Sequence, residues 1–228
     1  MSDRKQAEIE NPHLTKEPTV FGSPLDSASL AVLAVHGRGQ SPEYMRGLAE
    51  RIDIDDIGYL ALEADGGSWY PEGFLLPLEA NQPHLDHAVA AVLHHLRRLI
   101  ASGRPLEEIV VFGFSQGACL LSEVLLRTGM RPAAALLHTG GYPGPEEREA
   151  PLAEDAFAGM SAYFACSRAD AWVPLHRAEA TATAFAAAGA SVKFDTYDGG
   201  VHEVNDDSIH QMRKLLLKLG RCDDESQR

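Results

Sequence analysis

A serine between two glycines is the first feature of this 228-residue sequence whose setting predicts chemistry. Ser115 is the centre of Gly-Phe-Ser-Gln-Gly, residues 113–117, which stands between an apolar run at 109–112 and apolar residues at helical spacing over 120–125. A sharp strand-to-helix turn forces its serine toward positive φ and crowds the neighbouring backbone, so small residues are needed on both sides. The pattern predicts a nucleophilic serine at the end of a buried strand. The alternative is an ordinary strand–loop–helix connection.

An acid and a base that could activate this serine follow later in the chain. Asp170 comes after a strand expected at 163–166, and His202 comes after a strand expected at 192–197. The carboxyl ends of parallel strands meet at one edge of a sheet, so both side chains are expected near Ser115. The imidazole would take the serine proton, and the carboxylate would hold the imidazole tautomer. The order serine, acid, histidine is the one that accompanies a nucleophile on such a turn.

Other interpretations of the acid and the base stay open. Asp170 could instead cap the helix expected at 175–188. Asp195 and Asp198 are poorer candidates for the acid. His202 could be a histidine of a surface loop.

Two segments could supply backbone amides for the oxyanion that forms in acyl transfer. One donor is the N–H of the residue after the nucleophile, Gln116, and the other comes from a loop after an early strand. The sequence His-Gly-Arg-Gly, residues 36–39, follows the strand expected at 29–35, and its glycines let the backbone approach a substrate carbonyl. The Arg38 N–H is therefore the expected second donor. A plain turn at the end of the strand is the alternative.

A long loop between residues 64 and 82 is rich in glycine, proline and aromatic residues. Loops of this length within a compact domain are usually functional. Trp69, Tyr70, Phe74 and Leu75 are the candidates for the acyl or aryl pocket, and the alternative is that they pack into the core beneath the loop.

Apolar strands that alternate with amphipathic helices predict an α/β fold, with a mostly parallel central sheet and helices on both faces. Strands are expected at 29–35, 57–62, 109–112, 132–137, 161–166 and 191–197, with a short edge strand at 19–21. Helices are expected at 42–52, 83–102, after Ser115, at 175–188 and from 206 or 207 to about 219. A single domain is expected over 19–220, after a loosely ordered arm at 1–18 and before a polar tail at 221–228.

The composition excludes several classes of function. A formal net charge of −13 disfavours nucleic acid and anionic membranes as partners, because both are negatively charged and bind basic patches. No apolar run approaches the roughly 20 residues of a membrane span, and the polar first eighteen residues do not resemble a signal peptide. Three cysteines, an odd and small number, favour a reducing cytoplasm over a disulfide framework.

Several histidines and an aspartate gather in the helix expected at 83–102. They are His84, Asp86, His87, His94 and His95. Their spacing lacks the i, i+4 pair of a zinc-binding helix, so a solvated helix face is expected and no metal site. No cofactor is expected anywhere in the chain.

Five motifs together resemble the phospholipase/carboxylesterase family, which includes acyl-protein thioesterases and small bacterial carboxylesterases related to dienelactone hydrolase. The motifs are Val35-His-Gly-Arg-Gly39, Trp69-Tyr-Pro71, Gly113-Phe-Ser-Gln-Gly-Ala118, Asp170-Ala-Trp-Val-Pro174 and Tyr197-Asp-Gly-Gly-Val-His202, within residues 30–215. The resemblance implies an α/β-hydrolase fold without a large lid, and a cofactor-free serine hydrolase with Ser115, Asp170 and His202 as the catalytic triad. In two places the acid loop departs from the family pattern Gly-x-x-Asp-Pro. Ser167 replaces the glycine and Ala171 replaces the proline.

The function expected from these residues is that of a serine carboxylesterase, which hydrolyses small soluble carboxylic esters through an acyl-enzyme intermediate. A thioesterase or lysophospholipase of the same family is the alternative among enzymes. A hydrolase-like binding protein without turnover is the alternative from another class. The expected partner is a small-molecule ester or thioester, and the sequence leaves a homodimer open.

Overall fold

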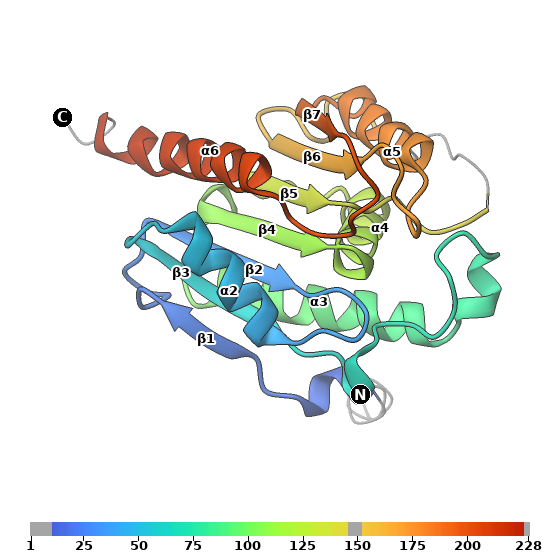
Figure 1. Ribbon diagram of the computed structural model, residues 1–228. Coiled ribbons are helices and arrows are strands. Elements are labelled where there is room, and N and C mark those ends of the chain that lie inside the picture. Colours follow the sequence, from blue (N-terminus) through green and yellow to red (C-terminus); the bar gives the residue numbers. More distant parts are fainter. Residues whose placement is uncertain (1–10, 146–151, 226–228) are drawn as a thin grey trace.

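The computed structural model describes residues 11–145 and 152–225, with side chains up to residue 220. Its centre is a seven-stranded sheet in the order β1-β3-β2-β4-β5-β6-β7 (Figure 1). The strands are β1 Thr19–Gly22, β2 Leu30–Val35, β3 Ile57–Leu62, β4 Ile109–Phe114, β5 Ala134–His138, β6 Ser161–Ser167 and β7 Ser191–Tyr197. Only the edge strand β1 runs antiparallel to its neighbour in this sheet. The expected α/β class with a mostly parallel sheet is confirmed.

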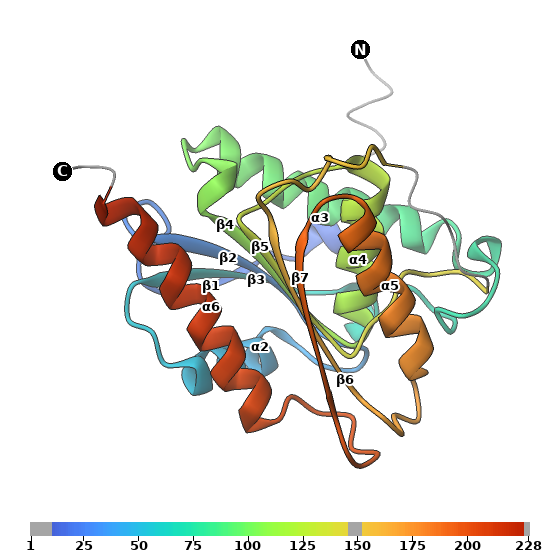
Figure 2. The same cartoon turned by 90° about the horizontal axis from the view of Figure 1, so that it is seen from above.

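Helices cover both faces of the sheet, as Figure 2 shows from above. They are α2 Pro42–Ile52, α3 His84–Ala101, α4 Gln116–Thr128, α5 Leu175–Ala187 and α6 Asp206–Glu225. The described ranges also contain four short 3-10 helices: η1 Pro12–Thr15, η2 Asp65–Gly67, η3 Leu78–Asn81 and η4 Leu106–Glu108. Helices α3, α4 and α5 share one apolar core with the sheet, and α2 and α6 share the other.

The central strand β4 shows why its sequence is apolar without alternation. Ile109 and Val111 pack into the core beneath α3, α4 and α5, whereas Val110 and Phe112 pack into the core beneath α2 and α6. All six residues of the strand are buried, because a parallel strand between two helical layers has no solvent face. The strand continues two residues beyond the expected 109–112. It ends at Phe114, directly before Ser115.

The two ends of the chain are more ordered than expected over their described parts. Asn11 and His13 are buried, and Pro12–Thr15 form η1 where a loose arm was expected. Residues 1–10 of that arm lie outside the described residues. Helix α6 extends to Glu225, so part of the expected tail at 221–228 continues the helix.

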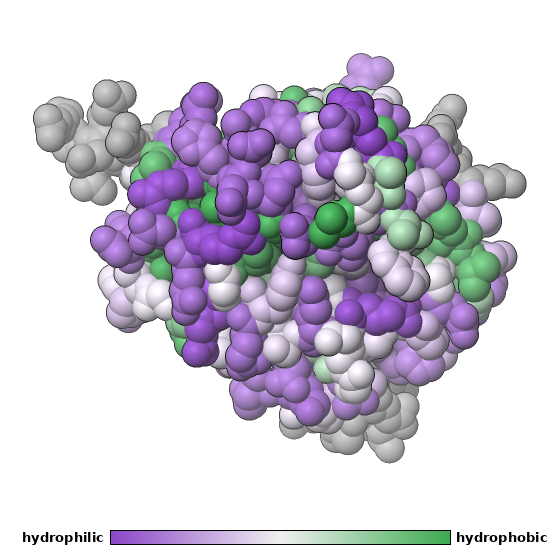
Figure 3. Space-filling view, viewed as in Figure 1, coloured by the Kyte–Doolittle hydropathy of each residue, from purple (hydrophilic) through white to green (hydrophobic). Residues whose placement is uncertain are grey.

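None of the helices in the described ranges combines the length and the apolar character that a membrane crossing requires. The face of the molecule seen in Figure 3 is mostly hydrophilic, and apolar residues show on it in small patches.

Candidate active site

Ser115 occupies a strained turn between β4 and α4. Its backbone has φ 54° and ψ −120°, a conformation that L-residues rarely adopt. The neighbouring glycines are required by close packing: a Cβ on Gly117 would lie 2.0 Å from the Val35 oxygen, and one on Gly113 would lie 2.7 Å from the Ala118 Cα. The turn therefore projects the serine hydroxyl beyond the carboxyl end of the sheet, as the sequence predicts.

The side chains of Ser115, His202 and Asp170 form one hydrogen-bonded row. The Ser115 Oγ lies 2.7 Å from the His202 Nε2, and the His202 Nδ1 lies 2.8 Å from the Asp170 Oδ2. With its proton on Nδ1, a neutral imidazole donates to the carboxylate and accepts from the hydroxyl. The three residues come from the ends of β4, β6 and β7, so the parallel sheet brings together positions that are 87 and 32 residues apart.

The second carboxylate oxygen of Asp170 is held by backbone amides. Its Oδ1 accepts hydrogen bonds from the Trp172 N–H at 2.9 Å and the Val173 N–H at 2.8 Å, and the side chain is fully buried. Asp170 does not cap α5, because the residue at that N-cap is Pro174. The two other carboxylates considered for this role pair elsewhere: Asp195 with Lys193 at 3.3 Å and Asp198 with Arg168 at 3.1 Å.

The loops that carry the acid and the histidine are joined to each other. The Ser167 hydroxyl donates to the Gly199 oxygen, and the Ala169 N–H donates to the same oxygen at 3.3 Å. The Arg168 N–H donates to the Tyr197 oxygen at 2.9 Å. Ser167, which departs from the family pattern, thus forms a contact that a glycine at this position lacks. Sequence reasoning noted the departure but not this contact.

The loop after β2 passes directly beside Ser115. A Cβ on Gly37 would lie 3.1 Å from the Ser115 Cβ, so the backbone comes this close only because residue 37 is a glycine. The Gly37 N–H donates to the Gln40 Oε1 at 2.9 Å, which fixes the turn, and the next residue is Arg38. The Arg38 guanidinium donates to the oxygens of Pro71 and Glu72, the latter at 2.7 Å.

The two amides predicted as oxyanion donors have no protein acceptor among the described residues. Gln116 is the first residue of α4, where no helical carbonyl can accept its N–H. Its side chain instead holds the long loop: the Oε1 accepts from the Trp69 N–H at 3.0 Å and the Nε2 donates to the Tyr70 oxygen at 2.8 Å. The Arg38 amide lies on the loop that Gly37 brings up to Ser115.

A pocket of 520 Å³ opens beside the Ser115 hydroxyl. Two of the four residues predicted for it, Tyr70 and Phe74, line its wall. The other two do not line it: Trp69 is 1% exposed within the core, and Leu75 packs against that core. The remaining lining residues are Arg38, Gly73, Ser115, Gln116, Cys119, Trp172, Val173 and His202.

Trp172 is the member of this lining that sequence reasoning missed most clearly. It is 73% exposed, an unusual state for a large aromatic side chain in a folded protein. Its amide is fixed by Asp170, so its position on the pocket wall follows from the same turn that holds the acid. The signal in the sequence was the motif Asp-Ala-Trp-Val-Pro itself, residues 170–174.

A buried histidine lies behind the row. His138 ends β5, and its carbonyl oxygen accepts from the Ser115 N–H at 3.0 Å. Complete burial lowers the pKa of its imidazole to about 3, so the ring is neutral at physiological pH. The ring lies 5.9 Å from that of Phe114, which in turn lies 5.2 Å from the ring of His202.

The histidines of α3 lie at positions 84, 87, 94 and 95. No group of three or more histidine, cysteine, aspartate or glutamate side chains in the described part of the chain is arranged to hold a metal ion. His95 differs from the solvated residue that was expected, because it is 6% exposed and burial lowers its pKa to about 4.

The chain is similar to a known family and to several solved structures. The family model Phospholipase/Carboxylesterase matches residues 19–219. The solved structure of a phospholipase/carboxylesterase from Dyadobacter fermentans is 30% identical, with a TM-score of 0.80 over 89% of this chain and 96% of that one. No curated protein matches the chain.

Two further solved structures show the same fold at lower identity. A carboxylesterase from Mesorhizobium loti is 21% identical, with a TM-score of 0.70 over 91% of this chain and 99% of that one. SOBER1 from Arabidopsis thaliana is 18% identical, with a TM-score of 0.70 over 83% and 98%. From the match over most of its length, this chain belongs to the phospholipase/carboxylesterase family of α/β-hydrolases, and it is a hydrolase of the serine esterase type.

Proposed function

We propose that this protein is a carboxylesterase that hydrolyses small carboxylic esters through an acyl-enzyme formed on Ser115. The observation that carries the proposal is the row Ser115–His202–Asp170, with contacts of 2.7 and 2.8 Å, at the wall of a 520 Å³ pocket. A nucleophile in contact with a base that a third group orients is the arrangement that acyl transfer requires.

In the first half of the reaction the Ser115 Oγ attacks the ester carbonyl carbon while its proton passes to the His202 Nε2. The carbonyl oxygen becomes an oxyanion, which accepts hydrogen bonds from the amides of Arg38 and Gln116. Each such donor contributes about 3 kcal/mol of transition-state stabilisation. When the intermediate collapses, the bond between the carbonyl carbon and the alcohol oxygen breaks, and the alcohol leaves with the proton from His202.

In the second half a water molecule attacks the acyl-enzyme. His202 takes a proton from the water, the same two amides hold the second oxyanion, and the bond to the Ser115 Oγ breaks. The serine recovers its proton from His202, and the carboxylic acid is released. Asp170 stabilises the imidazolium through its Oδ2, which faces the Nδ1–H, while two backbone amides hold its Oδ1. These steps need neither a metal nor a cofactor.

The walls of the pocket suit an apolar acyl or aryl group. Tyr70, Phe74, Trp172 and Val173 present aromatic and aliphatic surface, and burying such surface is worth about 25 cal/mol per Å². We therefore propose small-molecule esters as substrates. We also propose a reducing, cytoplasmic setting, a proposal supported by the two buried cysteines, Cys119 and Cys166, which are both free thiols.

The test is hydrolysis of p-nitrophenyl acetate and butyrate. Ser115→Ala abolishes most of the activity, whereas Ser122→Ala leaves it intact, because Ser122 lies on α4, the helix that follows Ser115, and its hydroxyl donates to the Ala118 oxygen inside the core. A folded protein that is inert to short esters, to thioesters and to fluorophosphonate labelling refutes the proposal. Higher kcat/KM for long-chain acyl thioesters or lysophospholipids than for short aryl esters reassigns the substrate within the family.

A further inference from the structure

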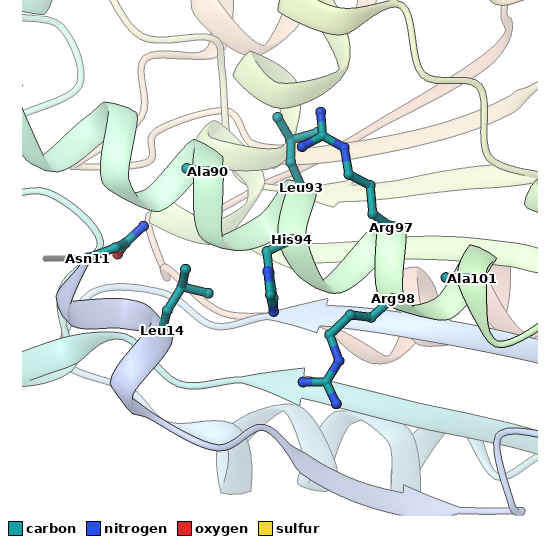
Figure 4. A pocket seen from close by; sticks show the side chains of 8 residues that line it. All are labelled: Asn11, Leu14, Ala90, Leu93, His94, Arg97, Arg98 and Ala101. Carbon is teal, nitrogen blue, oxygen red and sulfur yellow. The ribbon is translucent and has the colours of Figure 1, made fainter. Parts of the chain in front are cut away.

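The short segment Asn11–Thr15 is tied to the body of the domain by buried hydrogen bonds. Asn11 accepts at its Oδ1 from the His13 N–H at 3.1 Å and donates from its Nδ2 to the His87 oxygen of α3 at 2.7 Å. Both Asn11 and His13 are less than 5% exposed. Figure 4 shows Asn11 and Leu14 of this segment beside helix α3, where they form one side of a groove.

His13 uses both ring nitrogens to hold the loop that leads to the pocket. Its Nε2 donates to the Trp69 oxygen at 3.2 Å, and its Nδ1 accepts from the Asp65 N–H at 3.1 Å. These partners select the neutral ring with its proton on Nε2. Burial lowers the pKa of His13, which keeps the ring in this neutral form.

Trp69 connects that loop to both predicted oxyanion donors. Its ring centroid lies 5.2 Å from those of His13 and of His36. Its indole Nε1 donates to the His36 oxygen at 2.9 Å, two residues before one predicted donor. Its backbone N–H donates to the Oε1 of Gln116, the other predicted donor, at 3.0 Å.

His36 also uses both ring nitrogens for backbone hydrogen bonds, and its ring lies against Trp69 as that of His13 does. Its Nδ1 donates to the Gly37 oxygen at 2.7 Å, and its Nε2 accepts from the Ala64 N–H at 3.1 Å. The loop at 64–70 is thus held at one point by a histidine from the N-terminal segment and at another by a histidine from the loop after β2. Trp69 lies against both rings.

We infer that the N-terminal segment is part of the active-site framework, and that His13 is a positioning residue that acts through Trp69 on the backbone carrying the Arg38 and Gln116 amides. The inference rests on the proposed function, in which these amides hold the oxyanion. The segment lies about 100 residues before Ser115 in the sequence, and no part of it lines the pocket.

The experiment compares His13→Ala, His13→Gln and His94→Ala with the full-length wild type. His94 is the matched control, because it lines the groove beside the same segment but packs its ring against that of His95, with the centroids 5.1 Å apart. We expect His13→Ala to lower kcat for p-nitrophenyl butyrate tenfold to about a hundredfold, with KM little changed, because a displaced oxyanion donor weakens only the transition state. His13→Gln keeps a donor for the Trp69 oxygen and recovers most of the loss. His94→Ala behaves as wild type.

Hydrogen–deuterium exchange gives a readout that does not depend on turnover. We expect His13→Ala to speed exchange in the peptides covering 36–40 and 64–70 and to leave β4 and α4 protected. Wild-type kcat together with wild-type exchange in His13→Ala overturns the inference. So does a loss of activity that glutamine does not recover and that comes with faster exchange throughout the chain. If the wild type has no ester activity, the proposed function fails, and the exchange result still decides the role of His13.

Discussion

The Ser167 hydroxyl donates a hydrogen bond to the main-chain oxygen of Gly199, and so ties the loop after β6 to the loop after β7. Ser167 is fully buried, and the first of these loops carries the acid while the second carries the histidine. The family pattern has a glycine at this position. The substitution therefore adds a link between the two loops whose relative placement sets the geometry of the row.

Ser167→Ala removes this link, and we expect it to lower kcat several-fold and the free energy of unfolding by about 1 kcal/mol. The reason is that the Gly199 oxygen loses a buried donor and the histidine loop gains freedom. Ester kinetics and urea denaturation measure the two effects. Ser191→Ala, at the exposed start of β7, is the control and changes neither. An unchanged kcat in a folded Ser167→Ala protein contradicts a positioning role for this contact.

Asp170→Asn tests the identity of the acid. Asparagine keeps the shape but loses the negative charge that holds the imidazole tautomer, and we expect kcat to fall by about 10³ to 10⁴. The matched control is Asp198→Asn, which alters an exposed carboxylate that pairs with Arg168 on the neighbouring loop. That variant is expected to retain its activity, since exposed ion pairs contribute little. If Asp198→Asn loses activity and Asp170→Asn does not, the acid is on the loop after β7, and its assignment to Asp170 is wrong.

Trp172→Ala tests the role of the exposed tryptophan at the pocket. We expect kcat/KM for p-nitrophenyl butyrate or longer esters to fall about tenfold, because an apolar contact worth about 1.4 kcal/mol is lost. The effect on the acetate is expected to be smaller, since the acetyl group buries less surface. Val20→Ala, another exposed apolar residue but on the edge strand β1, is the control. Equal losses for all chain lengths would show that Trp172 does not contact the acyl group.

The buried neutral histidines predict a loss of stability in acid. Burial lowers the pKa of His95 to about 4 and that of His138 to about 3, from an ordinary value of 6.5. Below pH 6.5 the unfolded chain therefore binds protons that the folded chain does not, so the free energy of unfolding falls as the pH falls. The slope is up to about 1.4 kcal/mol per pH unit for each histidine, down to about pH 4 for His95 and pH 3 for His138.

Urea denaturation at pH 7 and pH 5 measures this loss. His95→Gln removes one of the titrating groups and reduces the difference between the two pH values. His210→Gln, at an exposed position of α6, is the control for the histidine-to-glutamine change itself. A free energy of unfolding that is the same at pH 7 and pH 5 in the wild type would contradict the prediction, because the folded protein would then take up as many protons as the unfolded chain.

The elements of the sheet and the turn at Ser115 could be predicted because their signals are local. Strand β4 is apolar throughout, the helical spacing begins directly after the serine, and each glycine of the motif meets a backbone atom that leaves no room for a side chain. The positions of Asp170 and His202 followed from the rule that parallel strands end at one edge. Their role in catalysis stays a prediction.

The pocket and the N-terminal segment could not be predicted in the same way, because they depend on contacts between distant residues. Trp69 and Trp172 both lie in loops without periodicity. Trp69 is held in the core by His13, and Trp172 is exposed at the pocket, but no local feature of the sequence distinguishes them. The polar composition of residues 11–18 suggests a loose arm. Its order comes from Asn11 and His13, which find partners 52 to 76 residues away.

The most direct test of the account is to identify the residue that a fluorophosphonate modifies. The wild-type protein is treated with the reagent, digested and mapped by mass spectrometry. The account predicts one adduct, on the Oγ of Ser115, that blocks ester hydrolysis in proportion to labelling and is absent in Ser115→Ala. An active enzyme whose adduct lies on another residue, or whose Ser115→Ala variant still hydrolyses esters at the wild-type rate, would contradict it.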